Sequence, residues 1–358
     1  MNRIIVRATA AALVAAGGLA LPATSTLRAD DTRNIAVARS TQGPERSLAE
    51  LVNKYQRPTS VPFPADNPYS KEKDLLGRTL FFDPRLSGSD FISCGTCHNP
   101  AFSWGDGNPR ATGHGMKVLG RRTPTILNLA WVDRMFWDGR AGSLEEQALG
   151  PIEAAGEMNL PLDQLIAKLD GIREYRPLFE RAFPGQGITK DGIAKAIATY
   201  ERTIVSGQAP FDRWVAGDDG AISESAQRGF VVFNGKAKCA TCHEGWSFTD
   251  GSFHDIGVRG ADIGRGAHLT RLPLMQHAFK TPTLRNVDRR APYMHDGSEP
   301  TLEATIDFYD RGGDVRRPSV ANDVRPLALT AGEKADLLAF LRTLTSEDAP
   351  VVIPSMPR

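Results

Sequence analysis

The chain has 358 residues, a length that predicts two domains of ordinary size. Its 43 basic and 42 acidic side chains leave a net charge of +1, which argues against nucleic acid or an anionic membrane surface as a partner. The 34 glycines, 24 prolines and 8% aromatic residues are typical of short helices joined by long ordered loops.

Residues 1–29 have the pattern of a secretory signal peptide. A basic start precedes an apolar run over residues 8–21, and small residues follow, with Ala23 or Ala29 as the expected last residue before cleavage. The run is too short for a comfortable membrane span, and no later segment reaches the required length. An uncleaved segment acting as an anchor is the alternative. We therefore expect export to the periplasm with the signal peptide removed.

All four cysteines lie in two CxxCH motifs. These are Cys94-Gly95-Thr96-Cys97-His98 and Cys239-Ala240-Thr241-Cys242-His243. Residues i and i+3 share one face of a helical turn, so both thiols of a motif can reach the two vinyl groups on one haem edge. The histidine is then held beneath the iron as its proximal ligand. We therefore predict two covalently bound haem c groups, with His98 and His243 on the two irons.

Disulfides, a redox-active CxxC pair and a four-cysteine zinc site are the alternatives for these cysteines. Disulfide or redox chemistry leaves the histidine after each second cysteine unexplained in both motifs. A zinc site would have to join cysteine pairs that lie 142 residues apart in the sequence. Haem attachment accounts for the cysteines and the histidines together.

The sequence around the two motifs repeats. Residues 124–128 read PTILN and residues 282–286 read PTLRN. An Asp-Gly pair follows each proline by 14 residues, at 138–139 and at 296–297, and each pair is followed by a helix start. This self-similarity predicts two cytochrome c-type domains related by duplication, each wrapped around one covalent haem.

Helical periodicity dominates the rest of the chain, and strand signals are few, so we expect a mainly α fold with long ordered loops. Apolar residues keep a 3.6-residue period over 193–204 and over 337–344, and Thr330 with Glu333 forms a capping-box signature before the second run. A domain boundary is expected near Gly207–Pro210. The predicted organisation begins with a lead-in at residues 30–62 that wraps over one domain. A first haem domain at 63–207, a second haem domain at 208–345 and a tail at 346–358 follow.

Several longer segments are specific to one family. They are FFDPRLSG at 81–88, FWDGRA at 136–141, Gln147 with Pro151 and Glu157-Met158, FKTPTLRN at 279–286, and APYMHDG at 291–297. In these segments the chain resembles the bacterial di-haem cytochrome c peroxidase and MauG family, over nearly all of its length after the lead-in.

The resemblance implies a division of labour between the two haems. The haem on His98 would react with peroxide, and the haem on His243 would transfer electrons. Trp137 would lie between them as a relay, unless it serves only in core packing. Glu157 would be the distal acid–base residue, with Gln147 lining the same pocket, because O–O cleavage needs a carboxylate that takes a proton and returns it to the departing oxygen. The alternative for Glu157 is a solvated side chain at a helix end.

Two positions point to different branches of the family. His114, 16 residues after His98, matches the loop histidine that caps the peroxide-reacting iron in resting peroxidases; the alternative is a surface-loop histidine. Tyr309 lies where those peroxidases carry an axial Met and where MauG carries Tyr. A phenolate stabilises ferric and higher oxidation states, whereas Met raises the potential. The alternative is that Met275 or Met294 binds the second iron.

The resemblance also implies calcium between the haems, held by an Asn side chain and two backbone carbonyls. Arg122 stands at the position of that Asn, and the carbonyls match Arg290 and Pro292. A guanidinium has no lone pair for a hard cation and repels it. We therefore expect either an empty calcium site or an Arg122 side chain that takes over the bridging role.

These observations predict a periplasmic peroxidase that reduces hydrogen peroxide through high-valent haem iron, with electrons passing between the haems. A small donor such as cytochrome c or a cupredoxin would supply electrons. A MauG-like enzyme that oxidises side chains of a partner protein at long range is the first alternative, and a non-catalytic di-haem electron carrier is the second. Either a monomer or a homodimer is compatible with the resemblance.

Overall fold

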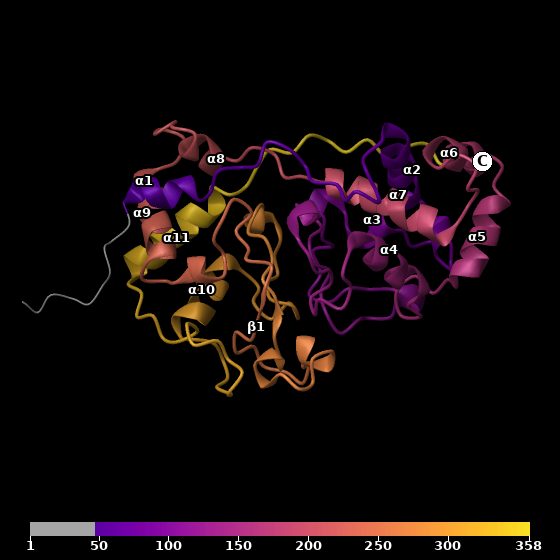
Figure 1. Cartoon of the computed structure of the whole chain (residues 1–358). Coiled ribbons are helices and arrows are strands. Elements are labelled where there is room, and N and C mark those ends of the chain that lie inside the picture. The colour runs from indigo at the N-terminus through magenta and orange to yellow at the C-terminus, as the bar shows by residue number, and fades with distance from the viewer. Residues whose placement is uncertain (1–46) are drawn as a thin grey trace, which may run out of the picture. The chain divides into compact units, whose positions relative to one another are not determined.

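The computed structural model describes residues 47–358, and these residues form a mainly helical fold (Figure 1). The predicted signal peptide and residues 30–46 of the predicted lead-in lie outside the described residues. The α-helices of this part of the chain are α1 (Leu48–Asn53), α2 (Lys71–Phe82), α3 (Cys94–Cys97), α4 (Leu144–Glu153), α5 (Leu162–Asp170), α6 (Tyr175–Ala182), α7 (Lys190–Thr203), α8 (Pro210–Val215), α9 (Glu224–Asn234), α10 (Leu302–Asp310) and α11 (Ala331–Arg342). The named strands are the antiparallel pair β1 (Phe253–His254) and β2 (Phe279–Lys280). The prediction of a mainly α fold is confirmed for the described residues.

Side-chain caps set where most of the longer helices begin. A Ser or Thr precedes each of six helices and accepts a hydrogen bond from the backbone N–H of the third helical residue: Ser70, Ser143, Thr189, Ser223, Thr301 and Thr330. Such a bond satisfies one of the N–H groups that a helix start leaves without a partner. The predicted capping box of Thr330 and Glu333 is present and confirmed.

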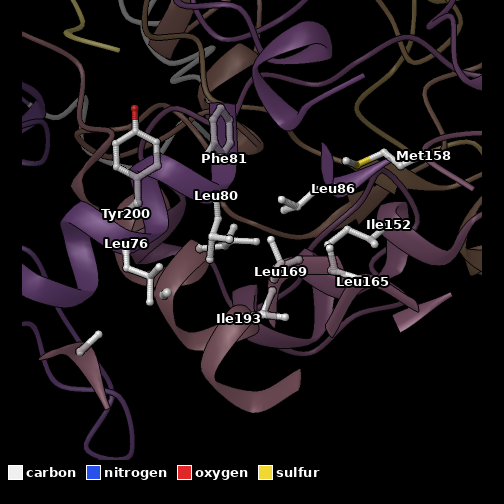
Figure 2. Close-up of a cluster of buried hydrophobic side chains, with 14 of the residues drawn as sticks. Leu76, Leu80, Phe81, Leu86, Ile152, Met158, Leu165, Leu169, Ile193 and Tyr200 are labelled. Atoms are coloured by element: carbon white, nitrogen blue, oxygen red, sulfur yellow. The ribbon is translucent and has the colours of Figure 1, made fainter. Parts of the chain in front are cut away.

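The first hydrophobic cluster lies among α2, α4, α5, α6 and α7 (Figure 2). Leu76 and Phe81 of α2 and Ile193 of α7 are completely buried in it. Met158 belongs to the same cluster, which fixes the backbone next to Glu157 by packing. Hydrophobic burial therefore positions one of the predicted catalytic residues.

The second hydrophobic cluster is aromatic and gathers around α8, α9 and α11. The ring of Phe340 lies 5.5 Å, between centroids, from the rings of both Phe211 and Phe230. Tyr55, which follows α1, is also completely buried there, with its ring 5.0 Å from that of Phe248. Part of the predicted lead-in thus packs into this second cluster.

The last residues of the chain run from the second cluster to the first. Ser346 donates from its hydroxyl to the side-chain oxygen of Asn286, near the start of this stretch. At its other end, Arg85 donates to the carbonyl of Pro357 at 2.9 Å, and Arg358 donates to Glu174 at 2.8 Å. Figure 1 shows the C-terminus beside α6. Residues 346–358 therefore join the two clusters.

Two glycines let helices cross at backbone contact. A Cβ on Gly77 of α2 would lie 1.9 Å from the carbonyl oxygen of Ala196 in α7. A Cβ on Gly229 of α9 would lie 1.9 Å from the carbonyl oxygen of Asp336 in α11. Both distances are far below van der Waals contact with backbone atoms that cannot rotate away. Each hydrophobic cluster thus depends on one helix pair that only glycine allows to approach so closely.

Gly77→Ala and Gly229→Ala should each destabilise the protein by about 1–3 kcal/mol, because the new methyl group forces a packed helix pair apart. Alanine normally stabilises a helix relative to glycine by roughly 0.5–1 kcal/mol, so the expected sign is the opposite of the helix-propensity effect. Gly332→Ala, in α11 with only the Thr330 hydroxyl oxygen within 4 Å of the new Cβ, at 3.9 Å, is the control. Urea unfolding followed by circular dichroism would measure all three, and an increase in stability for the two helix variants would refute the close-contact argument.

Candidate haem sites

The first CxxCH motif opens onto a cavity of about 580 Å³. The cavity is lined by the attachment residues and by the residues predicted to face the iron, namely Cys94, Cys97, His98, Gln147, Pro151 and Glu157. Apolar side chains such as Ile126, Leu127 and Met135 form other parts of the wall. The volume is in the range of small-molecule and cofactor sites, roughly 300–1,000 Å³, and an apolar wall suits the face of a macrocycle. The residues present therefore fit a haem.

Both motif histidines are fixed in the orientation that a metal ligand requires. Nδ1 of His98 lies 3.2 Å from the carbonyl oxygen of Trp104, and Nδ1 of His243 lies 2.7 Å from that of Phe248. When Nδ1 donates its proton to a carbonyl, Nε2 keeps its lone pair for iron. Burial lowers the pKa of both imidazoles, which favours this neutral form.

None of the four cysteines forms a disulfide, and burial favours the protonated form of three of the thiols. Burial raises the pKa of the Cys97 thiol to about 11 and that of Cys239 to about 12, and it raises the pKa of Cys94 still further. A redox-active CxxC pair needs the opposite, a thiol with a lowered pKa at an electropositive site. The structure therefore argues against disulfide exchange chemistry at either motif.

Glu157 lies in the turn after α4, in the wall of the first cavity. Burial raises the pKa of its carboxyl group, and the nearby charge of Arg140 acts in the opposite direction. A carboxyl group with a raised pKa exchanges protons closer to neutral pH, as general acid–base catalysis requires. The structure thus brings Glu157 and Gln147 to the same cavity as His98.

The loop that carries His114 is attached to the Glu157 segment. The backbone N–H of His114 donates to the carbonyl of Glu157 at 2.7 Å, and a Cβ on Gly113 would lie 2.0 Å from the carbonyl oxygen of Gly156. Gly113 lines the cavity, whereas His114 is not among the lining residues. Nδ1 of His114 is buried without a hydrogen-bond partner in the part of the chain that the structure describes. The ring predicted as a resting ligand therefore lies near the distal residue but off the cavity wall.

Trp137 joins the two halves of the described chain. It lines the first cavity, and its Nε1 donates to the carbonyl of Arg122 at 2.9 Å. Its own carbonyl accepts from the backbone N–H of Lys280 in β2 at 2.8 Å. Trp137 is therefore anchored both through its indole N–H and through its backbone carbonyl, and this fixes its position at the cavity wall.

Tyr309, in α10, is brought to the second CxxCH motif. Burial raises its pKa above the usual range, and the neighbouring thiols of Cys239 and Cys242 add to the shift. Met275 instead lines a different cavity, of about 780 Å³, whose wall contains none of the four cysteines. Tyr309 therefore has the better position of the two to face an iron held by His243.

A group of three potential metal ligands also adjoins the second motif. The ligand atoms of Cys242, Asp250 and His254 lie within 4.8 Å of one another, and Nε2 of His254 is 2.7 Å from Asp250. Haem attachment would use the Cys242 sulfur, which leaves a histidine–aspartate pair beside the haem edge.

Glu201 is a cavity residue that the sequence analysis missed. It is 4% exposed, and its Oε2 is buried with no hydrogen-bond partner among residues 47–358. Burial raises its pKa to about 8, so this carboxyl group is largely neutral at neutral pH. The sequence did contain a feature that could have indicated this buried carboxyl group: Glu201 lies four positions after Ile197, on the apolar face of α7.

Comparisons with known proteins identify the family. The family model for "Di-haem cytochrome c peroxidase" matches residues 71–220. The methylamine utilization protein MauG of Methylorubrum extorquens is 49% identical over 316 residues, which cover 87% of this chain and 89% of that protein. The cytochrome-c peroxidase IdrP1 of Pseudomonas sp. is 37% identical over 321 residues, which cover 80% of this chain and 84% of that protein.

The chain belongs to the di-haem cytochrome c peroxidase family. Membership identifies it as an oxidoreductase and haem c as its type of cofactor. The solved structure of a MauG-like protein associated with microbial copper homeostasis matches with a TM-score of 0.74 and 32% identity, over 82% of this chain and 95% of its own. Within residues 47–358, no helix combines the length and apolar character needed to cross a bilayer.

Glu201→Gln should stabilise the haem-loaded protein increasingly as the pH rises from about 4.5 to about 8. The unfolded chain releases the Glu201 proton near its ordinary pKa, whereas the folded chain keeps it until about 8, so the native carboxyl group costs stability across this window and Gln does not. Midpoints of thermal unfolding for both proteins between pH 4 and 9 would test this. A stability difference that stays constant with pH would contradict it.

Proposed function

We propose that this protein is a periplasmic di-haem peroxidase that reduces hydrogen peroxide to water, with electrons passing between two covalently held haems. The observation that carries the proposal is the first cavity, in which Glu157 and Gln147 share a wall with His98. Haem, when bound, supplies the iron at which the O–O bond is broken and the electrons that reduce it. The net reaction takes up two electrons and two protons for each peroxide and releases two water molecules.

The chain's own residues have distinct roles in this proposal. Cys94 and Cys97 would attach the first haem, and His98 would hold its iron through Nε2. The carboxylate of Glu157 accepts a proton from the bound peroxide and returns it to the departing oxygen. The amide of Gln147 orients the peroxide by hydrogen bonding. The apolar part of the wall limits the access of other water to the site.

The organisation in two haem domains, at residues 63–207 and 208–345, is part of the proposal. The backbone supports it, since left-handed conformations recur at corresponding positions. Trp104 and Phe248, which accept the histidine hydrogen bonds, have φ values of 65° and 53°. Asn128 and Asn286 have φ values of 63° and 56°. Non-glycine residues adopt this region rarely, so its recurrence favours a common origin for the two halves.

Electrons would enter through the haem on Cys239, Cys242 and His243 and reach the first haem by way of Trp137. A small redox protein, a cytochrome c or a cupredoxin, would be the donor. A plain electron carrier has no use for the polar side chains of Gln147 and Glu157 in a cavity beside an iron ligand.

Tyr309 favours a second candidate function. A buried phenolate on the second iron would make that haem hard to reduce and able to hold oxidising equivalents. The enzyme would then behave like MauG and oxidise side chains of a partner protein at long range. The 49% identity to the MauG of Methylorubrum extorquens supports this candidate as well.

Glu157→Gln should slow peroxide turnover by about 10²–10⁴-fold, because an amide cannot accept and return the peroxide proton. Glu153→Gln, an exposed position one turn earlier, should leave turnover unchanged and is the matched control. Stopped-flow measurement of peroxide consumption, normalised to haem content, gives both values. Equal turnover in the two variants would remove the role assigned to Glu157 and, with it, the main support for the peroxidase proposal.

Tyr309→Phe should convert the ferric second haem from a low-spin, six-coordinate state to a high-spin state, since the phenyl ring cannot bind iron. Electron paramagnetic resonance of the oxidised protein measures this directly. Met275→Leu is the control, and it should leave the spectrum unchanged. The opposite pattern, a change in Met275→Leu alone, would assign the ligand to methionine and would favour the peroxidase over the MauG-like candidate.

A further inference from the structure

Two buried arginines, Arg122 and Arg290, lie together without a carboxylate partner. Their residues are 9% and 8% exposed, and Nη2 of Arg122 donates to the backbone carbonyl of Arg290 at 2.9 Å. The guanidinium of Arg290 donates to the carbonyls of Asn286 and Thr283. Within residues 47–358 neither side chain forms an ion pair, and Nε of Arg122 is buried with no acceptor at all.

This arrangement is unlike that of other buried arginines in the structure. Arg285 pairs with Asp212 at 2.8 Å, and Arg202 pairs with Glu145 at 2.6 Å. Guanidinium groups keep their proton at all physiological pH values, so each unpaired one is a full positive charge away from water. Two such charges side by side repel each other and require a counter-charge. The described residues supply none in hydrogen-bond contact.

The pair lies beside the first cavity. Arg122 lines it, and so does Thr283, the residue whose carbonyl accepts from Arg290. The backbone of Arg122 is held in place on both sides, because its N–H donates to the carbonyl of His295 and its carbonyl accepts from Trp137. The cations therefore stand at the haem cavity next to the proposed relay.

Calcium does not fit at this position. The carbonyl of Arg290, which would be a ligand, already accepts a hydrogen bond from Arg122. Calcium binds six to eight oxygen ligands, and a guanidinium supplies only N–H donors. A divalent cation would also face two buried positive charges at short range.

A carboxylate does fit. Haem carries two propionate carboxylates, and a guanidinium binds a carboxylate through charge-assisted hydrogen bonds, with Nε–H as one of its donors. We propose that Arg122 and Arg290 form a permanent cationic pair that takes the place of the calcium ion expected between the haems and neutralises haem carboxylates. The inference depends on haem filling the first cavity, as proposed above.

The first test is calcium binding to the haem-loaded, chelator-washed wild-type protein, measured by isothermal titration. No binding, and no change in either haem spectrum on adding calcium or chelator, is the expected result. Binding of one calcium per chain would overturn the proposal whatever the variants do. Haem content is measured on the same samples. Calcium binding by haem-loaded protein would contradict only the arginine-pair proposal, whereas missing haem would contradict the proposed function.

The second test is the reduction potential of the first haem, measured by spectroelectrochemistry. Arg122→Gln and Arg290→Gln should each lower it, since loss of a positive charge disfavours the more negative, reduced haem. Arg289→Gln, an exposed neighbour, is the matched control and should leave the potential unchanged. Arg122→Lys keeps the charge, so its potential should lie closer to that of the wild type than that of Arg122→Gln.

Two results of this second test would overturn the proposal. One is a potential in Arg122→Gln and Arg290→Gln equal to that of Arg289→Gln. The other is a wild-type potential that shifts when acetate or phosphate is added at constant ionic strength, because a free anion would then be the counter-charge instead of haem. If the Gln variants fail to retain haem, the wild-type calcium and anion titrations still decide the question.

Discussion

The hydrogen bond from Nδ1 of each motif histidine to a backbone carbonyl connects the hydrophobic clusters to the chemistry. The acceptor residues, Trp104 and Phe248, are themselves buried members of the first and second cluster. Both have a positive φ, a conformation that costs of order 1–3 kcal/mol for a non-glycine residue. Aromatic packing compensates for this strain, and the turned backbone points the carbonyl at the imidazole. Helix packing in each half therefore determines where Nε2 of a histidine is directed.

The first cavity combines groups that would be unstable next to one another in a haem-free interior. Burial raises the pKa values of Glu157 and Glu201 in the cavity wall. It lowers the pKa of Arg122 in the same wall and lowers that of Arg290, beside the cavity, to about 9, so both guanidinium groups keep their charge at neutral pH. An apolar wall makes each charge expensive unless a bound group compensates it. A haem would bring apolar faces and negatively charged edges at once, which matches this mixture. The surroundings of the second CxxCH motif differ, since Tyr309 brings a weakly acidic hydroxyl group there, where the first motif has the carboxyl group of Glu157.

The sequence predicted those features that depend on local chemistry. The CxxCH motifs, the Thr330 cap and the helix over 193–204 follow from spacing and propensity, and Glu157 and Gln147 do line the cavity next to His98. The position of the His114 side chain was harder to predict from the sequence, because whether a loop side chain faces a cavity depends on the rotation of a single backbone segment. Glu201 and the environment of Arg290 depend on how distant helices and loops meet. Burial of a charged residue can be read only from that packing.

Arg122 shows how a single substitution can separate two functions of one residue. Its carbonyl accepts the hydrogen bond from Trp137, and its guanidinium carries the charge beside the first cavity. A change of side chain alters the charge but leaves the carbonyl, so the orientation of the proposed relay is retained. A metal ion at this position would be exchangeable and sensitive to chelators. A buried guanidinium is neither, so the proposed arginine pair would give this redox enzyme an electrostatic environment that does not depend on the calcium concentration around it.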